Sequence, residues 1–223
     1  MTAIHVEELV VHHGARCLLG PLSFALEPGA RLGLRGPSGA GKSTVLRTLV
    51  GLLPPELAAR GHVRTLGVDV LTRNGDLASL RARAILVGQT PVVFPGSILA
   101  NALFGLRHVV RATRAQLESR ARAALGEAGL WDEVADRLHA PAEQLSIGQR
   151  QRLCLARALA LDPTVLLLDE PTSSLDSAAT ATVEAAIAGL RGFRTLLVVS
   201  HDREQLERLC GGVVEVAGPR TDG

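Results

Sequence analysis

The sequence is poor in several kinds of residue, and each shortage excludes some classes of protein. Its three cysteines are too few and too far apart for a disulfide framework or a thiolate metal site, so we expect reduced thiols in a cytosolic protein. No apolar run approaches the roughly 20 residues that span a bilayer. The first eleven residues include charged side chains, unlike the apolar core of a signal peptide. We therefore expect any membrane role to depend on a partner protein.

Charge is nearly balanced along the chain. The formal net charge of the 223 residues is +2, which gives no electrostatic argument for binding nucleic acid or an anionic membrane. Lysine is almost absent, because Lys and Arg together number 24 and Lys42 is the sole lysine. Either this is chance, or position 42 requires a compact ammonium group that a planar guanidinium cannot replace. The residues around Lys42 favour the second interpretation.

The hydrophobic pattern predicts a single α/β domain. The first thirty residues alternate apolar and polar side chains between Gly and Pro, which predicts short antiparallel strands. Further strands are predicted at residues 31–34, 84–87, 165–168, 196–199 and 213–216, and helices at about 42–52, 178–190 and 204–210. Strands that alternate with helices imply a largely parallel sheet covered on both faces. We expect a core of residues 1–89 and 161–223, with an inserted helical subdomain at about 90–160.

A glycine-rich segment follows the strand predicted at 31–34. Residues 36–43 fit the phosphate-loop pattern G-x-x-x-x-G-K-[ST], in the strand-to-helix context that the pattern requires. Its glycines let backbone N–H groups face phosphate oxygens, which the positive end of the helix also favours. Lys42 is expected to reach the β- and γ-phosphates, and the Ser43 hydroxyl to bind Mg²⁺. The alternative is a glycine-rich turn without a ligand, which the context and the lone lysine disfavour. The candidate nucleotide-binding residues here are Gly36, Pro37, Ser38, Gly39, Ala40, Gly41, Lys42, Ser43 and Thr44.

Two carboxylates follow the most apolar predicted strand. Residues 165–168 read V-L-L-L, and Asp169 and Glu170 come next, at the end of the strand where an open α/β sheet binds ligands. We expect Asp169 to hold Mg²⁺ through water and Glu170 to orient and polarise the attacking water. Taken alone, the pair is equally consistent with a solvated acidic turn. The phosphate loop makes that alternative unfavourable.

Residues 145–149 read L-S-I-G-Q and open an amphipathic helix that Ser146 can cap. A capped helix is one sufficient explanation. The segment also resembles the LSGGQ signature of ABC ATPases, and it lies about twenty residues before the acidic pair, as in that family. The resemblance implies that Ser146 and Gly148 contact the γ-phosphate of an ATP held by the opposite subunit, and it adds Gln149 to the nucleotide-binding residues. Ile147 departs from the family because it replaces the first glycine.

Other landmarks of the family fall in the expected order. Gln89 resembles the glutamine that senses the γ-phosphate, contacts Mg²⁺ and lies beside the membrane partner. Asp176 resembles the acidic residue of the loop between subunits, and His201 resembles the switch histidine. Singly, Gln89 and His201 would be an ordinary loop residue and a strand-end histidine. The chain has no tyrosine, and His13 stands where an aromatic ring usually stacks on adenine.

The resemblance spans about residues 4–216 and implies the ABC ATPase fold, a P-loop core with an N-terminal antiparallel β subdomain and an inserted helical subdomain. It further implies ATP and Mg²⁺ as ligands, a second copy of the chain around two ATP molecules, and integral membrane permease subunits. A solute-binding protein acting through the permease, no nucleic acid, and a peripheral place on the cytoplasmic face of the cell membrane also follow. Within the family, the likeness is closest to the ATP-binding subunits of bacterial phosphate importers. It is carried by residues 94–98, 130–134 with 136–138, 151–154 and 179–180.

Three alternatives stay open at this point. The chain can drive another importer or a small metal-ion exporter, because the transported solute never touches this kind of subunit. A soluble ABC ATPase acting on DNA or the ribosome usually has coiled coils, zinc-binding cysteines or a second cassette, and the sequence has none of these. A non-catalytic nucleotide-binding module would be expected to lack the base or the switch, whereas Glu170 and His201 are both present.

Overall fold

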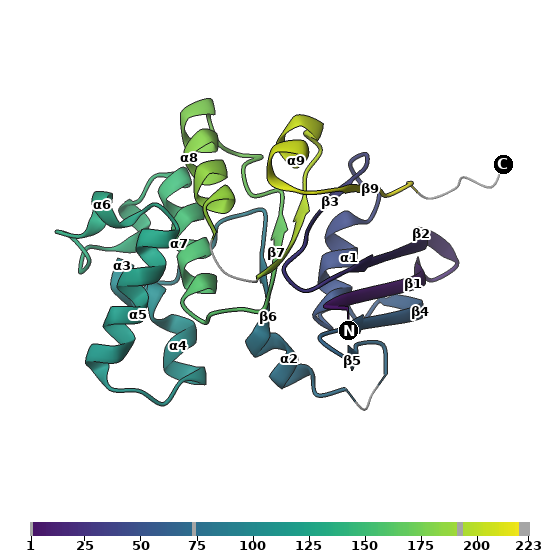
Figure 1. The fold of residues 1–223 in the computed structure, drawn as a ribbon, viewed down its shortest axis with the longest axis horizontal. Helices are drawn as coiled ribbons and strands as arrows, with labels where there is room; N and C mark the ends of the chain where they lie inside the picture. The colour runs from purple at the N-terminus through teal and green to yellow at the C-terminus, as the bar shows by residue number, and fades with distance from the viewer. Residues whose placement is uncertain (1, 73–74, 191–193, 219–223) are drawn as a thin grey trace. The chain divides into compact units, whose positions relative to one another are not determined.

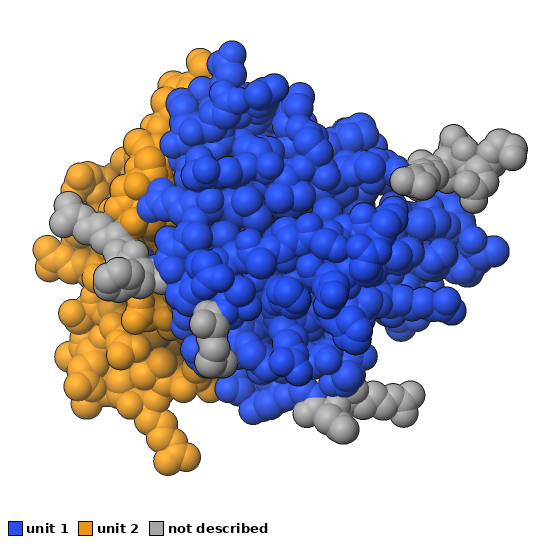
Figure 2. Space-filling view, turned by 45° about the vertical axis from the view of Figure 1, so that its right-hand side comes forward, with its two compact units in different colours: residues 1–86, 164–170, 192–223 blue, residues 87–163, 171–191 orange. Residues whose placement is uncertain are grey.

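A computed structural model describes residues 2–72, 75–190 and 194–218. Its contacts divide the chain into two compact units (Figure 2). Unit 1 contains residues 1–86, 164–170 and 192–223, and unit 2 contains residues 87–163 and 171–191. Residues 171–191 were assigned to the core on the sequence, whereas the contacts place them in the helical unit 2. The reason is that α8 (Ser177–Ala188) packs against α7 (Ile147–Leu159).

The first sheet of unit 1 is antiparallel, with the strand order β2-β1-β4-β5. Its strands are β1 (Ile4–His13), β2 (Arg16–Leu26), β4 (Leu57–Thr65) and β5 (Val68–Asp69). Figure 1 shows β1, β2 and β4 side by side, with α1 (Lys42–Leu49) next to them. The antiparallel prediction is confirmed, although β1 and β2 are 10 and 11 residues long rather than short. The strand β4 was not predicted, because most of its residues are exposed and its inward face is interrupted by Gly61 and ends in the polar Thr65.

The second sheet forms the core on which the site is built. Its strand order is β6-β7-β8-β3-β9, and the pairs β3–β8, β3–β9 and β7–β8 are parallel. The strands are β3 (Arg31–Arg35), β6 (Ala84–Val87), β7 (Val165–Asp169), β8 (Thr195–Val199) and β9 (Val213–Glu215). Every residue of β7 and β8 is buried, which explains why all of them except Asp169 and Thr195 are apolar. Unit 1 also contains α2 (Leu77–Arg83) and α9 (Arg203–Leu209). The largely parallel sheet is therefore confirmed.

Unit 2 is helical, as predicted, and α7 is its central helix because α3, α4, α5 and α8 all contact it. The remaining elements are α3 (Ile98–Ala102), α4 (Phe104–Val109), α5 (Arg114–Glu127), α6 (Trp131–Val134) and the 3₁₀ turn η1 (Ala142–Gln144). Capping boxes at Thr113 and Ser146 define the starts of α5 and α7. Within residues 2–72, 75–190 and 194–218, no helix combines the length and hydropathy needed to cross a membrane.

Candidate functional site

The glycine-rich segment begins where β3 leaves the sheet. β3 is held between β8 and β9, so the start of the segment has neighbours on both sides. A Cβ atom at Gly36 would lie 2.4 Å from the carbonyl oxygen of Val216, a distance that no side chain tolerates. The N–H group of Val216 in turn donates to the carbonyl of Arg35 at 2.6 Å. The path of the loop is therefore fixed by the end of β9 and requires glycine at position 36.

The loop runs directly into the N-terminus of α1. Gly41 is the N-cap residue and provides no side chain to bond the N–H groups of the first turn, which have no partners inside the helix. The Lys42 side chain is buried over the loop, and its Nζ donates to the carbonyls of Gly36 at 2.7 Å and Pro37 at 3.0 Å. An ammonium group with three donors bends into this space, whereas a planar guanidinium is wider. Backbone donors and one cation thus converge here, as an anion-binding site requires.

Asp169 ends β7 beside the start of α1. Its side chain is buried, and its Oδ1 accepts a hydrogen bond from the Ser43 hydroxyl at 3.0 Å. Burial raises the pKa of Asp169, the Ser43 hydrogen bond opposes that effect, and the neighbouring Glu170 charge raises the pKa further. A hydroxyl and a carboxylate are oxygen ligands of the kind that Mg²⁺ takes together with substrate phosphates. The two side chains therefore fit a magnesium ion.

Glu170 has an unusual backbone conformation. Its φ angle is 47°, in the left-handed region that non-glycine residues rarely adopt, and its N–H group donates to Val199 at 2.9 Å. Such strain costs about 1–3 kcal/mol and is concentrated at functional sites. The strained backbone places the Glu170 carboxylate against His201, with Oε2 2.8 Å from the ring Nδ1. The contact orients the carboxylate, which is then able to accept a proton from water.

The same contact determines which ring nitrogen of His201 carries the hydrogen. Because a carboxylate only accepts, Nδ1 of His201 carries the hydrogen, and Nε2 of a neutral ring is then an acceptor. Only the cationic ring donates through both nitrogens at once. His201 is exposed and Glu170 is largely covered, with side-chain exposures of 67% and 13%. A donor bond from Nε2 to a phosphate oxygen therefore requires the protonated ring.

Gln89 and Asp176 both belong to unit 2. The Gln89 amide donates to the hydroxyl of Ser173 at 3.1 Å, in the loop that precedes α8. Asp176 is the N-cap residue of α8, and its carboxylate accepts from the Ala179 N–H at 2.8 Å. The structure thus brings two of the predicted segments together within this unit and gives Asp176 a helix-capping role of its own.

The signature-like segment, residues 146–149, forms the start of α7. Ser146 is the N-cap, and its side chain and that of Gln149 bond each other's backbone N–H groups at 3.3 and 3.0 Å. Ile147 is half exposed, so its side chain does not disturb the helix packing. Gly148 faces α8, where a Cβ atom would lie 2.9 Å from the Cβ of Ala179. Of the two signature positions, only Gly148 is constrained to glycine by contacts within the chain.

His13 ends β1 on an exposed hairpin, where it pairs with Arg16. The next strand of the hairpin approaches the phosphate loop, because a Cβ atom at Gly41 would lie 3.1 Å from the side chain of Leu19. The hairpin that carries His13 and the phosphate loop are therefore packed in one unit.

Comparison with known proteins decides the family. The sequence matches the ABC transporter family over residues 19–173. It is 39% identical over 208 residues to the "Phosphate import ATP-binding protein PstB 2" of Bacillus subtilis (strain 168), a match that covers 92% of this chain and 77% of that protein. The chain belongs to the ABC transporter family. It is an ABC ATPase, an enzyme that binds and hydrolyses ATP.

Solved structures have the same fold as this ABC ATPase. A bacterial Atm1-family ABC exporter with ATP bound matches 98% of the chain with a TM-score of 0.81 and 27% identity, although the chain spans only 38% of that exporter. CbiO1 from Clostridium perfringens, part of the ABC transporter complex cbiONQ, matches 96% of the chain and 84% of its own, with a TM-score of 0.82 and 24% identity. The dimeric ATP-binding cassette MJ0796, bound to ADP and Pi, matches 97% of both chains with the same score and identity. The predicted ABC ATPase fold is confirmed.

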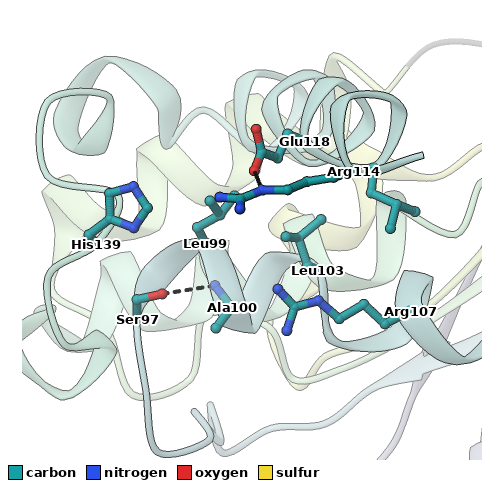
Figure 3. Close-up of a pocket in the computed structure, with 9 residues that line it drawn as sticks. Ser97, Leu99, Ala100, Leu103, Arg107, Arg114, Glu118 and His139 are labelled. Carbon is teal, nitrogen blue, oxygen red and sulfur yellow. Dashed lines mark hydrogen bonds and ion pairs between the residues drawn. The ribbon is translucent and has the colours of Figure 1, made fainter. Parts of the chain in front are cut away.

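Unit 2 of this ABC ATPase contains a cavity of about 450 Å³ between α3, α4 and α5. Its lining includes the apolar side chains of Leu99 and Leu103 and the guanidinium groups of Arg107 and Arg114, all labelled in Figure 3. A second cavity of about 460 Å³ is also lined by Leu99 and Arg114 and extends to Trp131. The two cavities together give unit 2 a hollow with apolar walls and a charged rim, on which Arg114 is ion-paired with Glu118 at 2.8 Å.

Sequence reasoning missed one group of residues beside the signature-like segment. The Glu133 carboxylate accepts hydrogen bonds from Gln149 at 2.7 Å and from Arg152 at 2.5 Å. Both Glu133 and Arg152 lie in stretches that resemble phosphate importers, which was the available signal. Nothing in their spacing indicated that the two stretches meet.

Proposed function

We propose that this ABC ATPase powers phosphate import through a membrane permease. The observation that carries the proposal is the 39% identity to a phosphate import ATP-binding protein over 92% of the chain. Four stretches that resemble phosphate importers support it, two of which border the cavities of unit 2. Neither the Atm1-family exporter nor cbiO1 offers a comparable argument for its own solute, because their sequence identities to the chain are only 27% and 24%.

The ATP triphosphate binds over residues 36–44 in this proposal. Backbone N–H groups of the loop and of the first turn of α1 bond its oxygens, and Lys42 neutralises charge on the β- and γ-phosphates. Ser43 and Asp169 would hold Mg²⁺, which when bound would draw negative charge away from the γ-phosphate. The adenine stacks on His13, whose imidazole offers less area than the rings usual in the family.

Glu170 activates the attacking water. Its carboxylate is already oriented by the 2.8 Å contact with His201 and by the strained backbone at φ 47°. The water donates to Glu170 while its lone pair faces the γ-phosphorus, so proton removal and attack proceed together. His201 then connects Glu170 to the γ-phosphate, provided that the ring is protonated and donates through Nε2.

Each ATP is completed by a second copy of the chain. Ser146, Gly148 and Gln149 of one subunit contact the γ-phosphate held by the other, and Asp176 lies in the loop between them. Two-fold symmetry makes two identical composite sites. The solved structure of MJ0796 is itself a dimer bound to ADP and Pi, which supports this arrangement. Hydrolysis removes the contact that joins the subunits, so the dimer opens and closes with each cycle.

The permease receives this movement through unit 2. We place its cytoplasmic segment against the cavities between α3, α5 and α6, beside the surface that follows Gln89, because both importer-like stretches meet there. Arg107 and Arg122 add positive charge beside the Arg114–Glu118 ion pair, which fits a segment with acidic residues. In this proposal the subunit lies on the cytoplasmic face of the cell membrane and acts with a solute-binding protein through the permease. It binds no nucleic acid.

Phosphate uptake tests the proposed solute. The gene is deleted from its own organism, and uptake of radiolabelled phosphate is measured at limiting phosphate. Deletion should abolish most high-affinity uptake, the wild-type gene should restore it, and the Lys42→Ala variant should not. Unchanged phosphate uptake in the deletion strain would assign the ATPase to another solute.

Mixing two inactive variants tests the composite site separately from the solute. In a mixed dimer of Lys42→Ala and Ser146→Arg, one site contains both lesions and the other contains neither. We expect each pure variant to be inactive and the mixture to regain ATP hydrolysis. Light scattering of Glu170→Gln should also show dimers that depend on MgATP. A mixture without activity, together with a monomeric Glu170→Gln, would contradict the composite site.

A further inference from the structure

We propose that Glu133 is a positioning residue that fixes the geometry of the signature-like segment, residues 146–149, and thereby the ATP site of the opposite subunit. This inference rests on the proposed composite site. Glu133 belongs to α6, which is separated from the segment by more than ten residues of sequence. Its role follows from its contacts with the first two turns of α7.

The contacts form one continuous chain of hydrogen bonds. Oε2 of Glu133 accepts from the Gln149 amide nitrogen at 2.7 Å. The amide oxygen of Gln149 accepts from the Ser146 N–H at 3.0 Å, and the Gln149 N–H donates to the Ser146 hydroxyl at 3.3 Å. The Ser146 hydroxyl acts as an acceptor in this arrangement, so its own hydrogen is available to a phosphate oxygen.

The direction of these bonds depends on Glu133 being a carboxylate. An ionised carboxylate accepts and never donates, so Gln149 must present its NH₂ group to Glu133. Its amide oxygen must then face Ser146, where an acceptor is needed. If position 133 instead presented a donor, the Gln149 amide would turn over and direct NH₂ at the Ser146 N–H. The capping box would be lost although every side chain kept its volume.

Arg152 anchors the carboxylate in place. Its side chain is only 7% exposed, and one guanidinium nitrogen donates both to Glu133 and to the carbonyl of Gly129, at 2.5 Å each. The Arg152 hydrogen bond lowers the pKa of Glu133 against the opposing effect of burial, so the carboxylate is ionised near neutral pH. A buried cation on one side and a helix cap on the other therefore hold one carboxylate between them.

The substitution Glu133→Gln tests the proposal without removing packing. Glutamine keeps one acceptor for Arg152 and offers a donor to Gln149, which is the change that should reverse the capping box. Asp132→Asn is the matched control, because it removes the same charge one residue away on α6 from a side chain that is exposed. Both substitutions are made in the Glu170→Gln background, and thermal unfolding is used to check that both variants fold.

We expect Glu133→Gln to weaken MgATP-dependent dimerisation about tenfold, because the loss of an outer partner that orients a binding group costs about 10- to 100-fold in metal sites. Asp132→Asn should leave the dimer dissociation constant unchanged, and ATP binding by either monomer should be normal. Equal dimer affinities for Glu133→Gln and Asp132→Asn would overturn the positioning role alone. Absence of dimers in the Glu170→Gln parent would refute the composite site, and the positioning role with it.

A mixing experiment shows on which ATP Glu133 acts. Wild type and Glu133→Gln are each mixed with an excess of Lys42→Ala and assayed for ATP hydrolysis. In the mixed dimer, the altered signature-like segment faces the inactive phosphate loop, while the intact site uses the segment of Lys42→Ala. The two mixtures should therefore have equal activity, although Glu133→Gln alone is slower than wild type at limiting subunit concentration. Lower activity of the Glu133→Gln mixture would mean that the residue acts on its own subunit, and would overturn the proposal.

Discussion

Replacing Gly148 by alanine tests how closely α7 and α8 pack beneath the signature-like segment. The added Cβ would lie 2.9 Å from the Cβ of Ala179, whereas two carbon atoms prefer about 3.5–4.0 Å. The helices must then separate by up to about 1 Å, and overpacking of this kind costs about 1–3 kcal/mol. Alanine also raises helix propensity, which returns about 0.8–1 kcal/mol. We therefore expect a net loss of about 0–2 kcal/mol in the free energy of unfolding.

The size of the clash is best measured by a double-mutant cycle with Ala179→Gly. That substitution removes the methyl group which the new Cβ would meet, so the double variant should avoid the overpacking. Urea unfolding of the wild type, both single variants and the double variant should give a favourable coupling energy of about 1–2 kcal/mol. In thermal unfolding, each kcal/mol corresponds to about 2–4 °C for a chain of this size.

Two results would refute this reasoning. If Gly148→Ala stabilised the protein by the full helix-propensity gain, α7 and α8 could not be as close as the structure shows. If the two substitutions were additive, no contact would exist between positions 148 and 179. ATP hydrolysis by the double variant adds a separate test, because recovery of stability without recovery of turnover would show that the phosphate itself requires glycine at position 148.

The other predictions concern single groups. Glu170→Gln should keep MgATP binding but lose about 10²–10⁴-fold in turnover, and near-normal hydrolysis would remove Glu170 from its role as base. Lys42→Arg should lose most ATP affinity in a fluorescent-nucleotide titration, because the guanidinium is too wide for the loop; unchanged affinity would make the lone lysine an accident. His13→Ala should weaken ATP binding between about pH 5.5 and 8 if the ring stacks on adenine. Equal ATP affinities of the variant and the wild type would show that adenine stacks on another residue. Burial raises the pKa of Cys210 to about 11. Its alkylation by iodoacetamide, followed by mass spectrometry, should therefore accelerate about tenfold per unit from pH 7 to 9, and a flat profile would contradict that pKa.

The sequence predicted those parts of the fold whose signal is local. β7 and β8 were predicted because all their residues are buried and all but Asp169 and Thr195 are apolar, so each strand is visible in its own sequence. The phosphate loop and the pair Asp169 and Glu170 were predicted because each motif is contiguous and lies at a strand end. For these elements, nearest neighbours in the chain contain most of the structural information.

The remaining parts depend on contacts between distant segments. β4 escaped prediction because its inward face, which contains Leu57, Ala59 and Val63, is interrupted by the exposed Gly61 and ends in the polar Thr65. The bonds from Glu133 to Gln149 and Arg152 join two helices that have no common periodicity. Residues 171–191 looked like part of the α/β core, yet α8 packs on α7, and only the tertiary contacts show this.

The position of β9 has a consequence for the order in which the protein becomes functional during synthesis. The phosphate loop is translated early, but β3 in front of it is flanked by β8 and β9, and Val216 covers Gly36. β8 and β9 are translated long after the loop, so the loop cannot take its final shape until both strands have left the ribosome. Contacts of such large sequence separation also form slowly, because a long loop must close first. A nascent chain should therefore be unable to capture ATP, and an incomplete subunit should not compete with finished ones for nucleotide.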